Sequence, residues 1–570
     1  MIPAIPGGAV SRATAALDRI EASDRPEIWI SLRTRADLLA EAAAIDAKVA
    51  GGDVLPLAGR LLAVKDNIDV RGLPTTAGAP SFAYKPTADA TAVARLRAAG
   101  ALVVGKTNLD QFATGLVGTR SPYGAVRNAW DPDRISGGSS SGSAVAVALG
   151  LVDLALGTDT AGSGRVPAAL NGIVGVKPSR GLVPVTGVVP ACYTLDCVTV
   201  FARDLGSARA AAELMAGPDP SDPLSRTLPA DAPLPPVPRV AVPTGEHLDG
   251  LAPGWAAAFA AVVERLASAG VEIVQTDISP LLDAARLLYE GAFVAERYAA
   301  VGSHLEANRD LVGTDLDPTV AEIVLGGASA TAADWARDVA LLARLGAAGR
   351  EALTGCSALL TPTTTWHPTL AEVAADPVGA NARLGRYTNF ANLLDMASLA
   401  VPAGQVDGLP FGVMLTGAAG SDRTLAALGH TLLSPAVDLF VVGAHLSGMP
   451  LNHQLVEAGA TLLRPVSTSA DYRLFALDTV PAKPGLVRVG DHGTSGPGAG
   501  VRIEGELWRV PAAGFGTFVG GVPAPMVIGK VMLEDGSSVS GFLVEPIAVE
   551  KAADISAYGG WRRYRSEQGL

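Results

Sequence analysis

The fold is decided by ISGGSSSGSAVAVALGLVDLALGTDTAGSGRVPAALNGIVGVKPSRG, residues 135–181. Two glycine- and serine-rich runs, GGSSSGS (137–143) and TDTAGSGR (158–165), enclose an apolar segment. This alternation predicts a loop, a helix over 143–149, a strand over 151–156, a second loop and a helix from about 166. Because a strand and a helix separate the two runs, we interpret them as structured loops rather than as flexible linkers.

The region upstream shows the same alternation of helices and short apolar runs. Residues 11–50 and 88–99 carry apolar side chains at three- and four-residue spacing, which predicts helices. Two short runs that end at a lysine are typical of buried strands: LLAV (61–64) before Lys65 and ALVVG (101–105) before Lys106. The alternation predicts parallel strands with crossover helices, and in such sheets the sites gather at the carboxyl ends of strands.

The rest of the chain predicts a change of architecture near residue 436. Helical patterns run over 254–269, 281–302 and 331–354, after a Pro-rich connection at 216–240. Beyond 436 the chain has short β-like runs separated by turn residues: LFVVGAH, ATLLRPV, YRLFALD, GVRIEGELWRV and APMVIGKVML. This pattern is typical of a small all-β or barrel-like domain. We therefore expect two domains, 1–436 and 437–570.

Composition narrows the class of protein. The chain has 570 residues, 49% of them hydrophobic and 18% charged, which indicates globular domains with a large core. We find no uninterrupted apolar run of about 18 residues, and the N-terminus lacks the basic start and apolar block of a signal peptide. The net charge of -12 disfavours nucleic acid or an anionic membrane as the main partner.

The cysteines and the spacing of ligand residues argue against disulfides and metals. Cys192, Cys197 and Cys356 form a sparse, odd set without close pairs. No cluster of metal-ligating residues has useful spacing, so we expect neither a metal nor another cofactor. The cytoplasm is the expected location.

Ser139 and Ser163 are the candidate nucleophiles, one in each glycine-rich loop. A serine hydroxyl needs a base, and none of the seven histidines lies within residues 1–246. A lysine can replace histidine when burial keeps it neutral. Lys65 and Lys106 both follow buried-looking runs, and composition alone does not separate them.

The segment GGSSSGSAVAVALGLVDLALGTDTAGSGRVPA, together with LAVKDNIDV upstream, resembles the amidase-signature family over roughly residues 20–435. The resemblance implies an α/β fold with a mixed central sheet covered by helices. It also implies a Ser-cisSer-Lys triad in which Lys65 is the general base, Ser139 the bridging serine and Ser163 the nucleophile. A cis peptide is implied at Gly138–Ser139. The backbone of Thr160, Ala161 and Gly162 can offer N–H groups to a tetrahedral oxyanion.

Two further segments resemble the allophanate hydrolase branch of that family. AGSGR (161–165) replaces the more usual GGSIR, and LLYEGAFVAERYAAV (287–301) is similar to a segment whose Tyr and Arg hold the substrate carboxylate. These residues correspond to Tyr289 and Arg297, which we expect on one helix about 80° apart around its axis. The branch implies hydrolysis of allophanate to ammonia and N-carboxycarbamate, which then gives further ammonia and CO2. A homodimer is implied at the family level.

The C-terminal region resembles the domain attached to allophanate hydrolases, a small barrel like that of gamma-glutamyl cyclotransferases. VVGAHLSGMPLN (441–452) and VRIEGELWRV (501–510) carry the similarity. Val519 stands where those cyclotransferases have a catalytic glutamate, so we expect a structural or oligomerising module. A less favoured hypothesis gives His492 a role in processing the N-carboxycarbamate.

Three alternatives stay open at this point. The chain can be an amidase acting on another small amide, in which case Tyr289 and Arg297 mislead about the substrate. It can be the glutamine-hydrolysing subunit of a tRNA-dependent amidotransferase, although the additional C-terminal domain disfavours that. A catalytically silent scaffold is disfavoured by the joint presence of Lys65, Ser139 and Ser163.

Overall fold

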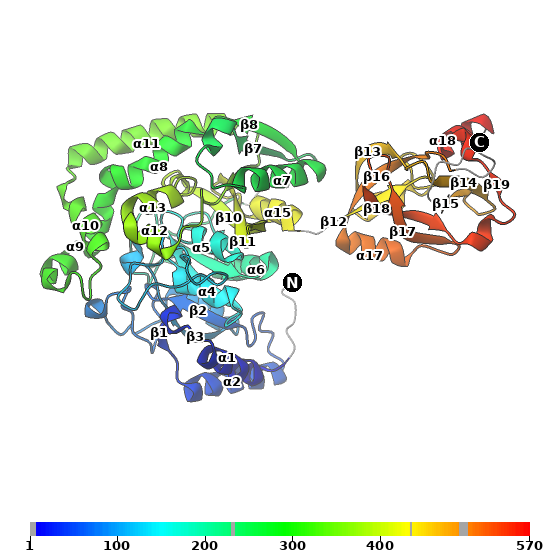
Figure 1. Cartoon of the computed structure of the whole chain (residues 1–570). Coiled ribbons are helices and arrows are strands. Elements are labelled where there is room, and N and C mark those ends of the chain that lie inside the picture. Colours follow the sequence, from blue (N-terminus) through cyan, green and yellow to red (C-terminus); the bar gives the residue numbers. More distant parts are fainter. Residues whose placement is uncertain (1–6, 230–233, 434–435, 490–499, 570) are drawn as a thin grey trace. The chain divides into compact units, whose positions relative to one another are not determined.

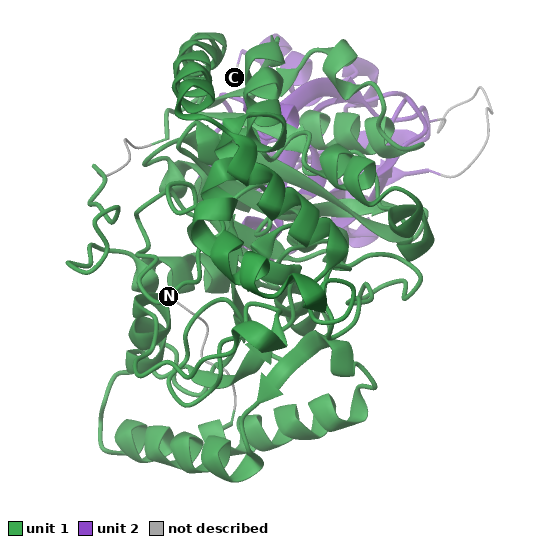
Figure 2. Ribbon diagram, turned by 90° about the vertical axis from the view of Figure 1, so that its left-hand side faces the viewer, with its two compact units in different colours: residues 1–264, 272–433 green, residues 265–271, 434–570 purple. Residues whose placement is uncertain are grey.

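The computed structural model describes residues 7–229, 234–433, 436–489 and 500–569. The chain forms two compact units, which Figure 2 colours separately. The first comprises residues 1–264 and 272–433, and the second comprises 265–271 and 434–570. The domain limits of 1–436 and 437–570 remain a prediction.

The first unit is built on an eleven-stranded mixed sheet covered by helices (Figure 1). Its strands, in order across the sheet, are β1 (Trp29–Leu32), β3 (Leu102–Thr107), β2 (Leu61–Lys65), β4 (Leu154–Asp159), β6 (Cys197–Ala202), β5 (Val174–Lys177), β10 (Met396–Val406), β11 (Leu409–Ala418), β9 (Ala358–Pro362), β7 (Arg239–Pro243) and β8 (Glu272–Thr276). The pairs β2–β3, β2–β4, β7–β8 and β7–β9 are parallel, and the others are antiparallel. The predicted mixed sheet covered by helices is confirmed.

Helices lie on both faces of this sheet. They are α1 (Ala9–Ala22), α2 (Arg35–Ala50), α3 (Thr91–Ala98), α4 (Ser141–Ala148), α5 (Val166–Asn171), α6 (Leu205–Met215), α7 (Trp255–Ser268), α8 (Ser279–Glu290), α9 (Ala295–Ala307), α10 (Pro318–Gly326), α11 (Ala332–Ala352), α12 (Leu370–Ala375), α13 (Pro377–Leu384), α14 (Phe390–Leu393) and α15 (Asp422–Leu433). Gly412 and Gly417 of β11 lie on opposite faces of the sheet, because residues five apart in a strand point to opposite sides. A Cβ on Gly412 would meet Ala169 of α5, whereas one on Gly417 would meet Ser421 and Leu425 at α15.

Helix α4 shows how the glycine-rich segment is fixed in the core. Residues 141–147 are all buried, and the helix sequence, SGSAVAVA, has no charged face. A helix buried all round must satisfy its polar atoms internally. The Ser143 hydroxyl does so by donating to the Leu156 carbonyl, 2.8 Å away, and by bonding Thr107. Ser139, just before α4, is thereby held against the carboxyl ends of β2 and β4.

Two predicted helical stretches are interrupted in the structure. Residues 11–50 contain β1, which pairs antiparallel with β3 after a turn that includes Pro26. The pattern over 281–302 breaks at Gly291 into α8 and α9, because the Ala292 N–H bonds the Asp338 carboxylate at 2.6 Å and leaves the helical ladder. A side chain at Gly291 would also collide with Asp338.

The second unit is β-rich, as predicted. One sheet has the order β13 (Thr461–Ser467), β16 (Glu504–Pro511), β12 (Ala436–Val441), β18 (Ser538–Val544) and β17 (Met526–Met532). A second sheet contains β15 (Lys483–Arg488), β14 (Tyr472–Leu477) and β19 (Ala553–Asp554). The helices are α16 (Asn452–Glu457), α17 (Ala512–Gly520) and α18 (Trp561–Glu567). The core has its own aromatic and aliphatic residues, including Phe440, Tyr472 and Trp508, and Val519 of α17 packs against it.

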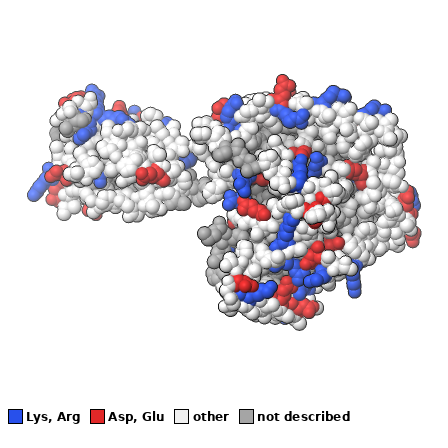
Figure 3. Space-filling view, turned by 180° about the vertical axis from the view of Figure 1, so that it is seen from behind, with Lys and Arg blue, Asp and Glu red and all other residues white. Residues whose placement is uncertain are grey.

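Two properties bear on possible partners: the distribution of charge on the surface, and the length and apolar character of the helices. On the face seen in Figure 3, Lys and Arg side chains alternate with Asp and Glu and do not gather by sign. Among the described helices, none combines the length and the apolar character that crossing a bilayer requires.

Candidate active site

Lys65 and Ser139 meet at the carboxyl end of β2. The Lys65 Nζ lies 2.7 Å from the Ser139 Oγ and 2.8 Å from the Thr158 Oγ1, and its side chain is fully buried. The Gly138–Ser139 peptide bond is cis, as expected. Burial lowers the pKa of Lys65 to about 7, although the charges of nearby buried aspartates oppose this. The amine is therefore available as a base near neutral pH.

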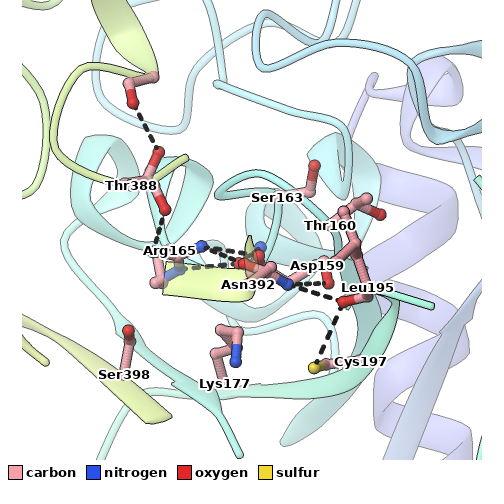
Figure 4. A network of polar contacts seen from close by, with 12 residues as sticks. Asp159, Thr160, Ser163, Arg165, Lys177, Leu195, Cys197, Thr388, Asn392 and Ser398 are labelled. Carbon is pink, nitrogen blue, oxygen red and sulfur yellow. Dashed lines mark hydrogen bonds and ion pairs between the residues drawn. The ribbon is translucent and has the colours of Figure 1, made fainter. Parts of the chain in front are cut away.

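Ser163 lies in the loop between β4 and α5. Its hydroxyl is buried, donates to the Gly115 carbonyl at 3.4 Å, and points away from the polar network beneath the loop (Figure 4). Within the described residues it makes no direct hydrogen bond to Ser139. Among the described residues, no turn or loop hydrogen bond uses the backbone N–H groups of Thr160, Ala161 and Gly162 as donors. Buried donors without acceptors are the groups that an oxyanion can bind.

A buried ion pair closes this loop from below (Figure 4). The Arg165 Nη2 lies 2.8 Å from the Asp159 Oδ1, and both side chains are fully buried. Arg165 also donates to the Thr388 carbonyl and to the Asn392 Oδ1, both at 2.9 Å. Although burial opposes it, the Arg165 charge holds the pKa of Asp159 below its usual range.

The position of Gly162 depends on the same network. Its φ is +149°, and a Cβ there would overlap the Thr388 hydroxyl. Both facts require glycine at this position. The neighbouring Thr160 hydroxyl donates to Asp196, a buried carboxyl whose pKa burial raises to about 6.

Tyr289 and Arg297 meet although they belong to different helices. Tyr289 lies in the last turn of α8, just before the break at Gly291, and Arg297 lies in α9. The Arg297 Nη2 donates to the Tyr289 hydroxyl at 3.1 Å, and Nη1 donates to the Thr114 Oγ1 at 3.0 Å. The expectation of one continuous helix was wrong, because Gly291 breaks it. The two side chains are nevertheless in direct contact.

Comparison with known proteins shows the family to which the chain belongs. The amidase family model matches residues 13–426. The chain belongs to the amidase family. The model of the allophanate hydrolase C-terminal domain matches residues 437–566. Both resemblances inferred from the sequence are thereby confirmed.

Several relatives of this amidase-family chain are known. It is 44% identical to the urea amidolyase of Lachancea kluyveri over 583 residues, covering 94% of this chain and 31% of the relative. The chain thus spans about a third of the length of the curated relatives it first matches. It is 36% identical to a glutamyl-tRNA(Gln) amidotransferase subunit of Thermus thermophilus, over 72% of this chain and 91% of that one. The solved allophanate hydrolase of Kluyveromyces lactis is 40% identical, with a TM-score of 0.70 for its selenomethionine-substituted structure and 0.69 for a serine-to-alanine variant. Each match covers 99% of this chain, and they cover 97% and 99% of the respective relatives.

Lys106, the other lysine that could act as the base, has different neighbours from Lys65. Lys106 is buried, with its Nζ 3.0 Å from the Asp66 Oδ1 and 3.1 Å from the Thr75 Oγ1. Burial lowers its pKa, but the Asp66 carboxylate opposes this. The structure therefore brings Lys65, and not Lys106, into contact with Ser139.

A cavity of about 950 Å³ opens beside Tyr289, one of the two residues expected to bind the substrate carboxylate. Tyr289, Arg120, Asn381 and Asn389 are among the residues that line it. The Asn381 side chain accepts the Leu116 N–H at 2.7 Å, next to the Gly115 carbonyl that holds Ser163. The cavity thus adjoins the loop that contacts the candidate nucleophile.

Sequence reasoning missed several groups of the site. Asp159 and Arg165 lay within the quoted motif, but nothing in it showed that they pair. Thr388 and Asn392 come from far along the chain and carried no local signal. In another part of the described chain, Glu246, His247 and Asp277 bring ligand-type atoms within 4.8 Å of one another, which the spacing analysis also missed. The two acids are exposed, and His247 pairs with Asp277 at 2.8 Å, which accounts for this group without a metal.

The C-terminal unit contains a separate cavity of about 560 Å³. His445 lies in its wall, stacked on Phe542 with ring centroids 4.9 Å apart, and its Nε2 is 2.9 Å from the Gln454 Oε1. Burial lowers the pKa of His445, which favours the neutral form of the ring. Lys483 also lines this cavity. His492, the histidine singled out from the sequence, lies outside the described residues.

Proposed function

We propose that this chain hydrolyses allophanate, with Ser163 as the nucleophile and Ser139 and Lys65 as the groups that move its proton. The single observation that carries the substrate assignment is Arg297. Arg297 is 1% exposed, and among the described residues its guanidinium donates to the hydroxyls of Thr114 and Tyr289 but forms no ion pair with a carboxylate. A buried cation without a counter-ion is costly unless an anionic ligand supplies one. The 40% identity with the allophanate hydrolase of Kluyveromyces lactis supports the same substrate.

The proposed chemistry begins with proton transfer. Neutral Lys65 accepts the proton of Ser139, and Ser139 accepts that of Ser163 as the Ser163 oxygen attacks the terminal carbamoyl carbon of allophanate. In the structure the Ser163 hydroxyl bonds Gly115, so it must rotate towards Ser139 for this step. The N–H groups of Thr160, Ala161 and Gly162 then bind the tetrahedral oxyanion.

Collapse of that intermediate breaks the bond to the terminal nitrogen. The proton returns along the same path, ammonia leaves, and a carbamoyl ester of Ser163 remains. Water, deprotonated by the same relay, releases N-carboxycarbamate and restores the Ser163 hydroxyl. Loss of CO2 from that product gives carbamate, which decomposes to the second ammonia and a second CO2.

The test is ammonia release from allophanate by the purified chain, beside malonamate, biuret, urea and glutamine. We expect preferred turnover of allophanate, abolished in Ser163→Ala. Turnover of another amide but not of allophanate refutes the substrate assignment and leaves the nucleophile supported. Dependence on glutamine and on a second protein supports an amidotransferase instead, a function that the match of residues 437–566 disfavours.

The C-terminal cavity supports a second candidate function. We infer that N-carboxycarbamate is processed there, because His445 supplies a proton carrier and Lys483 a cation in one cavity. Comparing His445→Ala with His492→Ala tests this against the hypothesis that favours His492. A loss of CO2 release in His445→Ala, with the first ammonia unchanged, supports the cavity. Unchanged CO2 release in both variants leaves the domain with a structural role.

We further propose that the enzyme works as a cytoplasmic homodimer without a cofactor. The family resemblance supports the dimer. The free thiols of Cys192, Cys197 and Cys356 support a reducing compartment. Light scattering of the purified chain measures the oligomeric state directly, and a monomeric mass refutes the dimer.

A further inference from the structure

The loop of residues 110–120 has a strained backbone. Phe112 and Ala113 are consecutive non-glycine residues with φ of 50° and 54°. The Asp110 carboxylate holds the loop in this shape by accepting the N–H groups of Val117 at 3.1 Å and of Gly118 and Arg120 at 3.0 Å. Strain of this kind persists where the surroundings over-determine the backbone, and it concentrates at functional sites.

The strained loop presents two adjacent residues to the two halves of the site. The Thr114 Oγ1 accepts a hydrogen bond from the Arg297 Nη1 at 3.0 Å, and the Gly115 carbonyl accepts the Ser163 hydroxyl at 3.4 Å. The Thr114 hydroxyl donates its own proton to the Phe112 carbonyl at 3.2 Å. Because that proton is committed, the oxygen of Thr114 can only accept from Arg297.

The guanidinium of Arg297 is held at two of its three nitrogens. Thr114 takes one proton of Nη1 and the Tyr289 hydroxyl takes one of Nη2. The Nε is buried and has no hydrogen-bond partner within the described residues. Both neighbours are neutral acceptors, so they fix the plane of the fork without neutralising its charge. The remaining donors are left for a carboxylate, which a guanidinium fork binds through two parallel bonds.

We propose that Thr114 is a positioning residue that gives this site its selectivity for amides bearing a carboxylate. Its hydroxyl sets the plane in which Arg297 meets the acid group, and its neighbour Gly115 contacts the nucleophile. One loop thereby fixes the position of the carboxylate-binding group relative to the nucleophile. The inference rests on the proposed function in that Ser163 is taken as the reacting group.

The experiment uses matched acid and neutral amides. Biuret is allophanate with its carboxylate replaced by a carboxamide, and malonamide is related to malonamate in the same way. We would measure kcat/KM for all four with the wild-type chain, Thr114→Val and Thr114→Ser, and record Tm for each. Thr114→Val keeps the shape of the side chain and removes the acceptor. A hydrogen bond to a charged group corresponds to about a 10- to 100-fold effect, so we expect that loss for the acids only.

Two comparisons separate positioning from a structural role. Thr114→Ser keeps the hydroxyl and is expected to retain the preference for acids. In an Arg297→Met background, Thr114→Val is expected to have no further effect on the acids, because Thr114 acts through Arg297. An equal loss for acid and neutral amides, or an undiminished acid preference in Thr114→Val, overturns the proposal.

The outcomes also distinguish this inference from the proposed function. If the wild-type chain turns over malonamate but not allophanate, the substrate assignment fails, and the malonamate and malonamide pair still decides the role of Thr114. If the wild-type chain shows no preference for the acid in either pair, both the substrate assignment and the role of Thr114 are refuted.

Discussion

The pH dependence of the reaction follows from the burial of Lys65. Burial lowers the pKa of this amine from 10.5 to about 7. At pH 7 about half of the side chain is then neutral, against about one part in 3000 for a lysine of ordinary pKa. Because only the neutral amine can accept the proton of Ser139, the active fraction of enzyme should follow this ionisation.

The assay is kcat/KM for ammonia release between about pH 5.5 and 9. We expect a tenfold rise per pH unit at the acid end, a bend near pH 7 and a plateau above it. Malonamate serves as a second probe, since a bend shared by both amides belongs to the free enzyme. A rise that continues without a bend to pH 9 refutes the reasoning, because Lys65 would then have an ordinary pKa. A flat profile refutes it as well.

Three further predictions concern stability and the nucleophile loop. Lys65→Met should abolish activity yet raise the free energy of unfolding by a few kcal/mol at pH 7, because folding lowers the pKa of this lysine below its unfolded value. The gain in stability should be complete below pH 7 and vanish as the pH rises to 10.5. Urea titrations at several pH values measure it. Arg165→Met leaves Asp159 buried without its partner and should lower the free energy of unfolding by about 3–5 kcal/mol. A loss below about 1 kcal/mol in urea titrations contradicts a stabilising role for this ion pair. Gly162→Ala should lower both kcat and Tm, because the new Cβ overlaps the Thr388 hydroxyl in the nucleophile loop. Gly404→Ala, at a φ of +133° with open space around it, should leave kcat unchanged, and equal kcat in the two variants contradicts the steric argument.

How much of this site could be predicted from sequence depends on the distance over which each signal acts. Lys65, Ser139 and Ser163 could be named because each lies in a short motif that resembles the amidase-signature family. Arg297 could be named only through resemblance. Thr388 and Asn392 could not be named at all, because they reach the nucleophile loop from more than 200 residues away. Thr388 lies in the turn before α14 and Asn392 in α14, and neither carries a local signal.

The helix break at Gly291 shows a second kind of limit. Apolar periodicity over 281–302 predicted one helix, and it does continue on both sides of the break. A single glycine inside such a pattern is usually tolerated, so nothing local indicates an end there. The break depends on the Asp338 carboxylate, which takes the Ala292 N–H from a distant helix. Tertiary contacts, rather than local propensity, decide this boundary.

Burial can lower the pKa of Lys65 because the three buried aspartates near it, whose charges oppose the shift, are bonded to other groups. Any one of them, paired directly with the amine, would hold it charged. Instead Asp159 is occupied by Arg165, Asp110 by backbone N–H groups and Asp196 by Thr160. Lys65 is left with two hydroxyl neighbours, those of Ser139 and Thr158. The same acids that shape the loops thus leave the base without a counter-ion, so loop architecture and base strength are set by one arrangement of charges.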